Sequence, residues 1–349
     1  MNTTLKKLCI ALIAILLCVA GLLGYFTYYE YRPEPVEDIK VSDGTKRINM
    51  DDEISIMSFN TGYAGLSHNE DFFMDGGEKV EPESEELVRE NINGIGKTIK
   101  DIDADFTFLQ EVDIDSKRSF NINEKDIYED MTGKDSVFAY NFKCNFVPYP
   151  LPFIGKVESG LVTLTDHKMS DAKRIALPES FKWPVKTCNL KRCMLETRIP
   201  VDGSDKELVL INFHLEAYDS GEGKIAQSRM LAEKLEEEYK KGNYVIAGGD
   251  FNQTFEGMDT YPIHDKDGWV PGVIGSSEIG DGFSFAVSDN EPTCRLLNGP
   301  YSGNFEESQV YVIDGFIVSD NIEVSSVENI RTEFRYSDHQ PVLMNFKLN

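Results

Sequence analysis

Seven short apolar runs recur between residues 51 and 349, and they constrain the fold more than any other feature. They are EISIMSFN (53–60), DFTFLQE (105–111), SGLVTLT (159–165), ELVLINFHLE (207–216), YVIAGGD (244–250), YVIDGFIVSD (311–320) and QPVLMNFKL (340–348). Apolar runs of this length predict strands that are buried on both faces. Apolar residues at helical spacing occur in two stretches, 82–103 and 223–243, so these predict helices.

Buried strands with few helices between them favour an α/β sandwich with helices outside. A doubly wound parallel sheet is the alternative, and it fits less well because residues 112–206 offer little helical periodicity. The sequence contains no internal repeat. One domain spanning residues 51–349 is therefore the simplest division.

Residues 1–31 form a separate apolar segment. Lys6 and Lys7 precede an uncharged run, 8–29, that is long enough to cross a membrane as a helix. The flank after it is mostly acidic, which predicts a single-pass cell-membrane anchor with the bulk of the chain extracytoplasmic. The alternative is a cleaved signal peptide and a secreted protein, with Cys18-Val19-Ala20 as the cleavage site. The anchor is favoured because apolar residues continue past Ala20, and the polar segment 32–50 then predicts a linker.

Charge and cysteine content narrow the possible partners and bonds. The chain carries 35 basic and 60 acidic side chains, a formal net charge of −25. Such a surface repels nucleic acid at long range, so nucleic-acid activity would need a local patch or bound cations. Outside the anchor there are four cysteines, which allow three pairings. A Cys188–Cys193 bond and four free buried thiols both remain open, with Cys144 and Cys294 as the other two.

Most of the predicted strands carry an acid, an amide or an imidazole at or near one end. Asn60, Glu111, His214 and Asp250 with Asn252 come at strand ends, Asp314 lies within the run 311–320, and Asp338 with His339 stands just before the last strand. Each alone is compatible with turn chemistry or a solvated strand end. Gathered at one sheet edge, however, they predict a site. Oxygen ligands suit a hard cation such as Mg²⁺, and an Asp with two histidines supplies general-base, orienting and phosphate-binding groups.

The stretch AGGDFNQTF (247–255) illustrates how a strand end presents such groups. Gly248 and Gly249 allow close approach to neighbouring strands. Asp250 and Asn252 lie two apart in a segment expected to be extended, so they should face the same side. Phe251 should then point into the core.

In this order, the motifs resemble the endonuclease/exonuclease/phosphatase superfamily, which includes pancreatic-type DNase, abasic-site endonucleases, inositol polyphosphate 5-phosphatases and magnesium-dependent neutral sphingomyelinases. The matching motifs are MSFN (57–60), LQEVD (109–113), INFHLEAYD (211–219), GGDFN (248–252), IDGFIVSD (313–320) and YSDHQPVLMNF (336–346). They span about 290 residues. The resemblance implies a four-layered α/β/β/α sandwich of the DNase I-like kind and metal-dependent phosphoester hydrolysis.

The resemblance also implies a role for each motif residue. Asn60 and Glu111 would hold Mg²⁺ (or Mn²⁺), with Asp338 completing the ligand set. His339 would lie beside the scissile phosphate, oriented by Asp314. Asp250 would orient or deprotonate the attacking water, Asn252 would hold phosphate and water in line, and His214 would contact a phosphate oxygen. Arg192 is the candidate for a further phosphate contact, whereas Thr61-Gly62 replaces an acid that often follows the first motif, which leaves a second metal in doubt.

The substrate is less constrained than the chemistry. Lys182, Lys186, Lys191 and Arg192 surround Trp183, a pattern that fits a lipid head group, a nucleic-acid strand or a solvated loop. The tether and the acidic charge favour a lipid head group or a small organic phosphate. An extracellular DNase-type endonuclease is the alternative. A catalytically inactive binding module is the second alternative, and the motif residues that such modules lose are present here. No protein partner is indicated.

Overall fold

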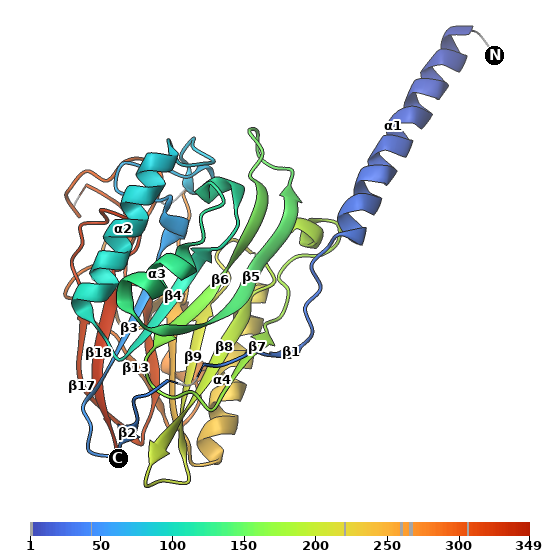
Figure 1. Ribbon diagram of the computed structural model, residues 1–349. Coiled ribbons are helices and arrows are strands. Elements are labelled where there is room, and N and C mark those ends of the chain that lie inside the picture. The colour runs from blue at the N-terminus through green and yellow to red at the C-terminus, as the bar shows by residue number, and fades with distance from the viewer. Residues whose placement is uncertain (1–2, 43, 220, 259–260, 265–267, 306) are drawn as a thin grey trace.

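The computed structural model describes residues 3–349 apart from 43, 220, 259–260, 265–267 and 306. Two β-sheets pack face to face, with helices on both outer faces (Figure 1). The larger sheet has the order β1 (Val36–Asp38), β7 (Asp171–Ala176), β8 (Cys193–Asp202), β9 (Glu207–His214), β10 (Tyr244–Asp250), β16 (Asp314–Ser319), β13 (Phe283–Ala286), and β2 (Ile48–Asn49) pairs with β8. The smaller sheet has the order β17 (Ile322–Asn329), β18 (Val342–Leu348), β3 (Ile54–Asn60), β4 (Phe106–Asp113), β6 (Gly155–Thr165), β5 (Asp135–Val147).

The helices cover the outer faces because each has one apolar side. α2 (Glu85–Ile102) packs with α3 (Glu124–Thr132) on the smaller sheet, where Ile92 and Ile95 join the same apolar cluster as Leu109 of β4. α4 (Glu222–Lys240) covers the larger sheet, and its Leu231 lies in one cluster with Val245 of β10. The predicted four-layered DNase I-like α/β/β/α sandwich is confirmed.

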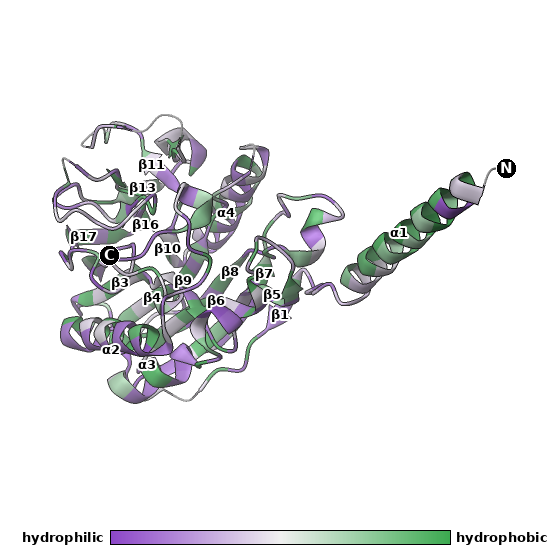
Figure 2. Cartoon of the chain, turned by 90° about the horizontal axis from the view of Figure 1, so that it is seen from above, coloured by the Kyte–Doolittle hydropathy of each residue, from purple (hydrophilic) through white to green (hydrophobic). Residues whose placement is uncertain are grey.

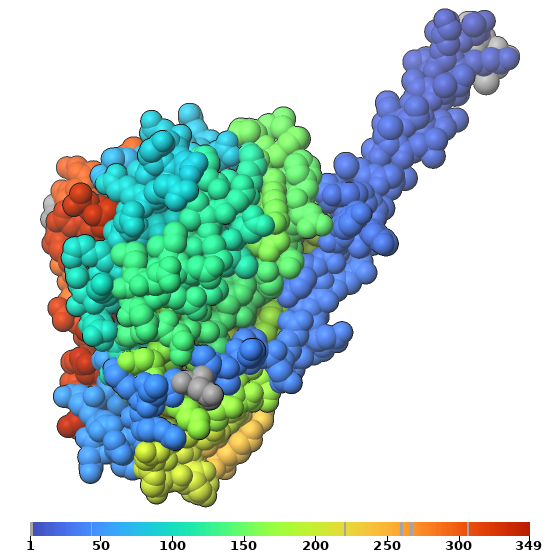
Figure 3. Space-filling view, viewed as in Figure 1, coloured from blue at the N-terminus to red at the C-terminus, as the bar shows by residue number. Residues whose placement is uncertain are grey.

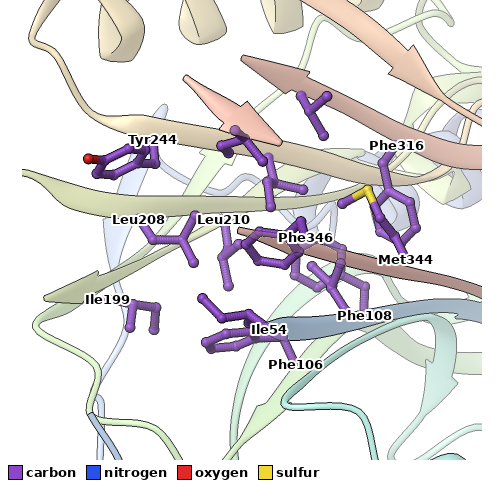
Figure 4. Packing of buried hydrophobic residues seen from close by; sticks show 14 of the residues in the cluster. Ile54, Phe106, Phe108, Ile199, Leu208, Leu210, Tyr244, Phe316, Met344 and Phe346 are labelled. Atoms are coloured by element: carbon purple, nitrogen blue, oxygen red, sulfur yellow. The ribbon is translucent and has the colours of Figure 1, made fainter. Parts of the chain in front are cut away.

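Strand periodicity builds the inner core. Alternate residues of a strand point to opposite faces, so Ile54 and Ile56 of β3 face the other sheet while Met57 faces α2. Figure 4 shows side chains from both sheets meeting in this central layer, including Phe108 and Phe316. This buried layer fixes the two sheets relative to each other, and so it fixes the edge at which their strands end.

Most predicted elements are present, and the differences have local causes. The predicted helices correspond to α2 and α4, and the run 311–320 divides into β15 (Val310–Tyr311) and β16, which begins at Asp314. Residues 112–206 contain α3, β5, β7 and β8, which the periodicity did not reveal. One face of β5 meets solvent, so its residues alternate between half-exposed and buried and do not form a continuous apolar run. The helix α3 has only nine residues, which is too short for a clear helical period.

The segment 32–50, predicted as a linker, is partly structured. β1 pairs antiparallel with β7, and β2 pairs parallel with β8. Ile39 and Val41 also pack against the central core. Short strands of two or three residues carry too little periodicity to be recognised in the sequence, because their pairing depends on the free edge of a sheet that is formed elsewhere.

The N-terminal helix α1 (Thr3–Tyr28) projects away from the sandwich (Figures 1 and 3). Figure 2 shows its largely hydrophobic surface. Among the described residues it is the one helix long and apolar enough to cross a membrane, a test that a signal sequence also passes. Of the residues of α1 only Phe26 is buried, near the end that meets the domain.

The four cysteines of the domain are free thiols. Cys144 and Cys188 share an apolar cluster and their thiols interact. Cys193 lies instead 3.6 Å from the carbonyl oxygen of Tyr140. The sequence left open a Cys188–Cys193 disulfide or free thiols, and the structure has free thiols. The cysteine next to Cys188 is Cys144 and not Cys193.

Candidate active site

Strand register brings three of the predicted residues to one level of the larger sheet. Asp250, the last residue of β10, pairs with His214 of the parallel strand β9 and with Asp314 of the antiparallel strand β16. Gly249 permits this close packing, since a Cβ there would collide with the carbonyl of Phe213. On the smaller sheet, Asn60 ends β3 beside β4, which carries Glu111. The two sheets thus present their polar strand ends at the same edge of the sandwich.

Two of these residues have left-handed backbone conformations. Glu111 has φ +56° within an irregularity of the β4–β6 pairing, and Asn252 has φ +51°. The extended geometry expected through Asn252 is therefore wrong, because β10 ends at Asp250. The Asn252 backbone N–H instead donates to Asp250 Oδ1 at 2.8 Å, while Phe251 is buried in the core as expected.

His339 is held by Asp314 at the start of β16 and by Ser337 of its own loop. Its Nδ1 lies 2.9 Å from Asp314 Oδ2, and its Nε2 lies 3.7 Å from Asp250 Oδ2. Ser337 fixes the loop before it, because its hydroxyl donates to the Asn60 carbonyl at 2.8 Å and accepts from the His339 backbone N–H at 3.2 Å. The imidazole is thus oriented by Asp314, with its other nitrogen facing the site.

The amide of Asn60 connects the acids of the two sheets. Its Nδ2 donates to Glu111 Oε1 at 3.1 Å and to Asp250 Oδ2 at 3.0 Å. Its Oδ1 accepts from the backbone N–H of Gly62 at 3.0 Å. A second buried pair connects β4 with β9 of the other sheet, because Gln110 Nε2 donates to Asn212 Oδ1 at 2.8 Å.

His214, Asn252 and Arg192 lie in the same cavity as the acids. His214 Nε2 is 3.4 Å from Asp250 Oδ2, and Asn252 Nδ2 donates to the Leu215 carbonyl at 2.9 Å. Arg192 is buried and donates to Glu216 at 3.3 Å and to the His214 carbonyl at 3.0 Å. All nine predicted residues are therefore brought together, although Arg192 is engaged with Glu216.

Burial and mutual repulsion perturb the titrating groups. Burial raises the pKa of Asp250 to about 7, opposed by His339 and reinforced by Asp314. Burial likewise raises the pKa of Asp338 to about 7, opposed by His339 and reinforced by Glu111. Burial lowers the pKa of His339, but Asp314 and the other anionic neighbours outweigh it and hold that pKa well above its ordinary value.

The second histidine has the opposite character. Burial, followed by the positive charges of Arg192 and His339, holds the pKa of His214 well below its ordinary value. Its Nδ1 is buried without a hydrogen-bond partner among the described residues. The environments of the two histidines therefore shift their pKa values in opposite directions, upward for His339 and downward for His214.

The acids provide a fitting environment for a metal ion. Glu111 and Asp338 offer the carboxylate oxygens that Mg²⁺ and Mn²⁺ prefer, whereas the Asn60 amide oxygen accepts from the backbone N–H of Gly62. The raised pKa of Asp338 beside Glu111 reflects buried negative charge that a cation would stabilise. Ligand atoms of Asp250, Asp314 and His339 also lie within 4.8 Å of one another, but the His339–Asp314 hydrogen bond already uses Nδ1 and one oxygen there. The described residues thus offer acidic groups that could hold a divalent cation, and Glu111 and Asp338 both line the same cavity.

Several residues that line the cavity were not predicted as site residues from the sequence. Tyr218 donates to Asp75 Oδ1 at 2.7 Å, and burial raises the pKa of that acid. The Arg118 guanidinium lies 3.7 Å from the centre of the Tyr63 ring. Tyr218 did fall within a quoted motif, but its partner is 143 residues away, so only the fold reveals the pair.

The basic cluster around Trp183 is largely neutralised. Lys191 is buried and pairs with Glu30 and Glu179, each at 2.9 Å. Lys186 lies 3.3 Å from Glu179. These ion pairs join the segment after α1 to the 179–191 loop. The lysines thus contribute to docking of α1, which does not fit the head-group or nucleic-acid patch considered from the sequence.

The fold and the site define a phosphoesterase or nuclease hydrolase of DNase I-like architecture. A family model, Endonuclease/Exonuclease/phosphatase family, matches residues 91–339, and the chain belongs to this family. A search of curated protein sequences found no match.

Solved structures support the fold. An endonuclease/exonuclease/phosphatase from Beutenbergia cavernae aligns with TM-score 0.59 at 17% identity, covering 85% of this chain and 72% of that one. Truncated TDP2 from Caenorhabditis elegans aligns with TM-score 0.52 at 17% identity, covering 84% and 98%. The human nocturnin catalytic domain with bound sulfate anion aligns with TM-score 0.52 at 15% identity, covering 89% and 98%.

Proposed function

We propose that the chain is a Mg²⁺-dependent phosphodiesterase, with Mn²⁺ as a substitute, anchored in the cell membrane with its catalytic domain extracytoplasmic. Lipid head groups or small organic phosphates are its favoured substrates. The observation that carries this proposal is the convergence of two histidines, three acids, one amide and an arginine from distant segments on one cavity, with Asn60 and Asp314 hydrogen-bonded to them. That set supplies cation ligands, a proton acceptor and donors to phosphate oxygens.

Metal binding is assigned to Glu111, Asn60 and Asp338. A bound divalent cation would neutralise the anionic oxygens of the phosphate group. The placement is supported by the position of Glu111 and Asp338 on one cavity, and by the burial and the neighbouring Glu111 charge that raise the pKa of Asp338.

The remaining residues bind the phosphate group and orient the attacking water. Asp250 orients the attacking water and accepts its proton, while Asn252 aligns water and phosphate through the amide N–H not used by Leu215. His339, oriented by Asp314, donates from Nε2 to the phosphate or the departing oxygen. His214 and Arg192 contact further phosphate oxygens, and the bound sulfate of the nocturnin structure is compatible with an anion site in this fold.

The overall reaction consumes one water. The water oxygen bonds to phosphorus, one P–O ester bond breaks, and the released oxygen takes a proton and leaves as an alcohol. The charge of −25 supports small or lipid phosphates over long duplexes, since a polyanion is repelled at long range.

Three substrates assayed side by side with Mg²⁺ test the proposal: bis-p-nitrophenyl phosphate, sphingomyelin and plasmid DNA. Hydrolysis of the first or second supports it, preference for plasmid DNA supports the nuclease alternative, and no hydrolysis supports the inactive binding module. His339→Ala and Asp250→Asn should abolish activity with unchanged circular dichroism. Activity that survives both substitutions contradicts the site assignment.

The anchor needs its own test, because a signal sequence shares the properties of α1. The full chain should stay in the membrane fraction after alkaline carbonate extraction, and its mature N-terminus should begin before Leu8. A soluble protein that begins near Gly21 would show that the segment is cleaved.

A further inference from the structure

The catalytic residues open into a cavity of about 610 Å³ that extends to the N-terminal helix. Glu111, Asp250 and His339 line it, and so do Leu23 and Phe26 of α1. A volume of this size is typical of sites that enclose a small organic ligand. The cavity therefore links the polar strand ends with the end of the apolar helix.

Between these two regions the walls are mainly apolar. They include Phe142 and Val147 of β5, Ile154 of the following loop, Phe181, Leu190 and Leu297. A sugar or nucleobase attached to the phosphate would place unpaired polar groups against these side chains, which is unfavourable. A hydrocarbon chain would instead gain about three- to fourfold in affinity for each methylene buried.

Specific contacts hold the end of α1 against the domain, next to the cavity. Phe26 is buried, and Trp183 Nε1 donates to Thr27 Oγ1 at 3.0 Å. The Glu30–Lys191 ion pair at 2.9 Å has both side chains almost fully buried. If α1 spans a bilayer, the part of the cavity lined by Leu23 and Phe26 therefore lies next to the membrane surface, near the aromatic residues that end the helix.

Exposed apolar residues lie on the two loops beside this end of α1. Tyr149 and Leu151, in the loop between β5 and β6, are 67% and 78% exposed, and Trp183 and Val185 are 54% and 56% exposed. The β5–β6 hairpin and the base of α1 lie on the same upper side of the domain (Figures 1 and 3). Apolar side chains concentrated beside a membrane helix suit contact with the lipid interface.

We infer that the cavity is a binding site for the hydrocarbon chain of a membrane lipid, and that the substrate is a lipid phosphodiester whose phosphate reaches the Asp250–His339 end. This inference rests on the proposed function and narrows it to an amphiphile that enters directly from the bilayer. The head of the lipid would meet the acids and histidines, while its chain lies between β5 and the 177–191 loop.

The test uses the full chain in lipid nanodiscs. The readout is the ratio of kcat/KM for long-chain phosphatidylcholine or sphingomyelin to kcat/KM for bis-p-nitrophenyl phosphate, which has no hydrocarbon chain. Ile154→Trp fills the cavity and Val185→Asp charges its apolar surroundings, so each should lower the ratio at least tenfold. Ile225→Asp, on α4 with 54% exposure, is the matched control and should leave the ratio unchanged.

An unchanged ratio in both variants would overturn the inference. A chain-length series with the unmodified protein provides a second measurement if a variant fails to fold: kcat/KM should rise with acyl length until the cavity is filled, and independence of length would count against a chain site. Hydrolysis of bis-p-nitrophenyl phosphate without any lipid hydrolysis overturns this inference alone. Hydrolysis of neither substrate contradicts the proposed function itself.

Discussion

His339 Nδ1 and Asp314 Oδ2 lie 2.9 Å apart, both buried, although they belong to different segments of the chain. The contact fixes the orientation of the imidazole and stabilises its protonated form, because the pKa of His339 is held well above its ordinary value against the effect of burial. The site thus contains an oriented imidazole whose Nε2 lies 3.7 Å from Asp250 Oδ2.

Asp314→Asn should therefore lower kcat more than it changes KM. The amide cannot stabilise the imidazolium by charge, so we expect a decrease of about 10²–10⁴-fold, the range typical of a lost acid–base group. Steady-state kinetics on bis-p-nitrophenyl phosphate measure it. Asp320→Asn, an exposed acid just after the same strand, is the control. Equal kcat values in the two variants would refute the role of the pair.

Removal of divalent cations should abolish hydrolysis, and Mg²⁺ or Mn²⁺ should restore it. Glu111→Gln keeps the side-chain shape but loses the charge that a hard cation needs. The Mg²⁺ concentration for half-maximal activity should therefore rise. Substitution of residues that only contact metal ligands typically weakens metal binding about 10–100-fold, and the loss of a ligand should exceed this. Titration of activity with Mg²⁺ checks this, with the exposed Glu83→Gln as control. A Glu111 variant with unchanged Mg²⁺ dependence would place the metal elsewhere.

Stability at acidic pH should depend on Glu238 of α4. This buried acid pairs with Arg198 at 2.7 Å and with Lys234 at 2.8 Å. Burial raises its pKa, but Arg198, Lys234 and Lys241 outweigh that effect and lower it. A lowered carboxyl pKa contributes stability above its unfolded value of about 4.3, and the contribution is lost as pH falls through the folded pKa.

Glu238→Gln should consequently lower the free energy of unfolding at pH 7 by about 1.5–3 kcal/mol, since it removes a charged hydrogen-bond partner, although Arg198 and Lys234 each keep an ion pair with Glu196. The loss should shrink in denaturant titrations at low pH. Glu236→Gln removes an exposed acid of the same helix that pairs only with Lys240, and it should cost less than about 0.5 kcal/mol. Similar losses for both would show that burial of Glu238 is unimportant.

Cys144 and Cys188 should form a disulfide when the domain is exposed to an oxidant such as diamide. Their thiols interact, and the pKa of Cys188 is lowered to about 7, first by its hydrogen bond with Cys144. Alkylation and mass spectrometry of peptides would identify the bond, and Cys144→Ser should prevent it. Cys193→Ser should not, because that thiol contacts Tyr140. A Cys188–Cys193 bond in the oxidised protein would contradict this expectation.

Local properties of the chain explain what could be predicted. Strand and helix periodicity is readable over six to twenty residues, so β3, β9, β10, α2 and α4 were recognisable, as were the polar residues at the strand ends. The edge strand β5 and the short strands β1 and β2 were not, because half-exposed or very short segments carry a weak signal.

The sequence by itself determined the sandwich and the list of polar residues, because periodicity and motif spacing are properties of neighbouring residues. Only the tertiary structure decided how those residues meet. Asn60 reaches Asp250 across 190 positions, Arg192 is engaged by Glu216, and Asn252 turns left-handed after β10 ends. The apolar cavity between the site and α1 likewise arises from loops that are distant in the chain, so its shape depends on packing that no local pattern encodes.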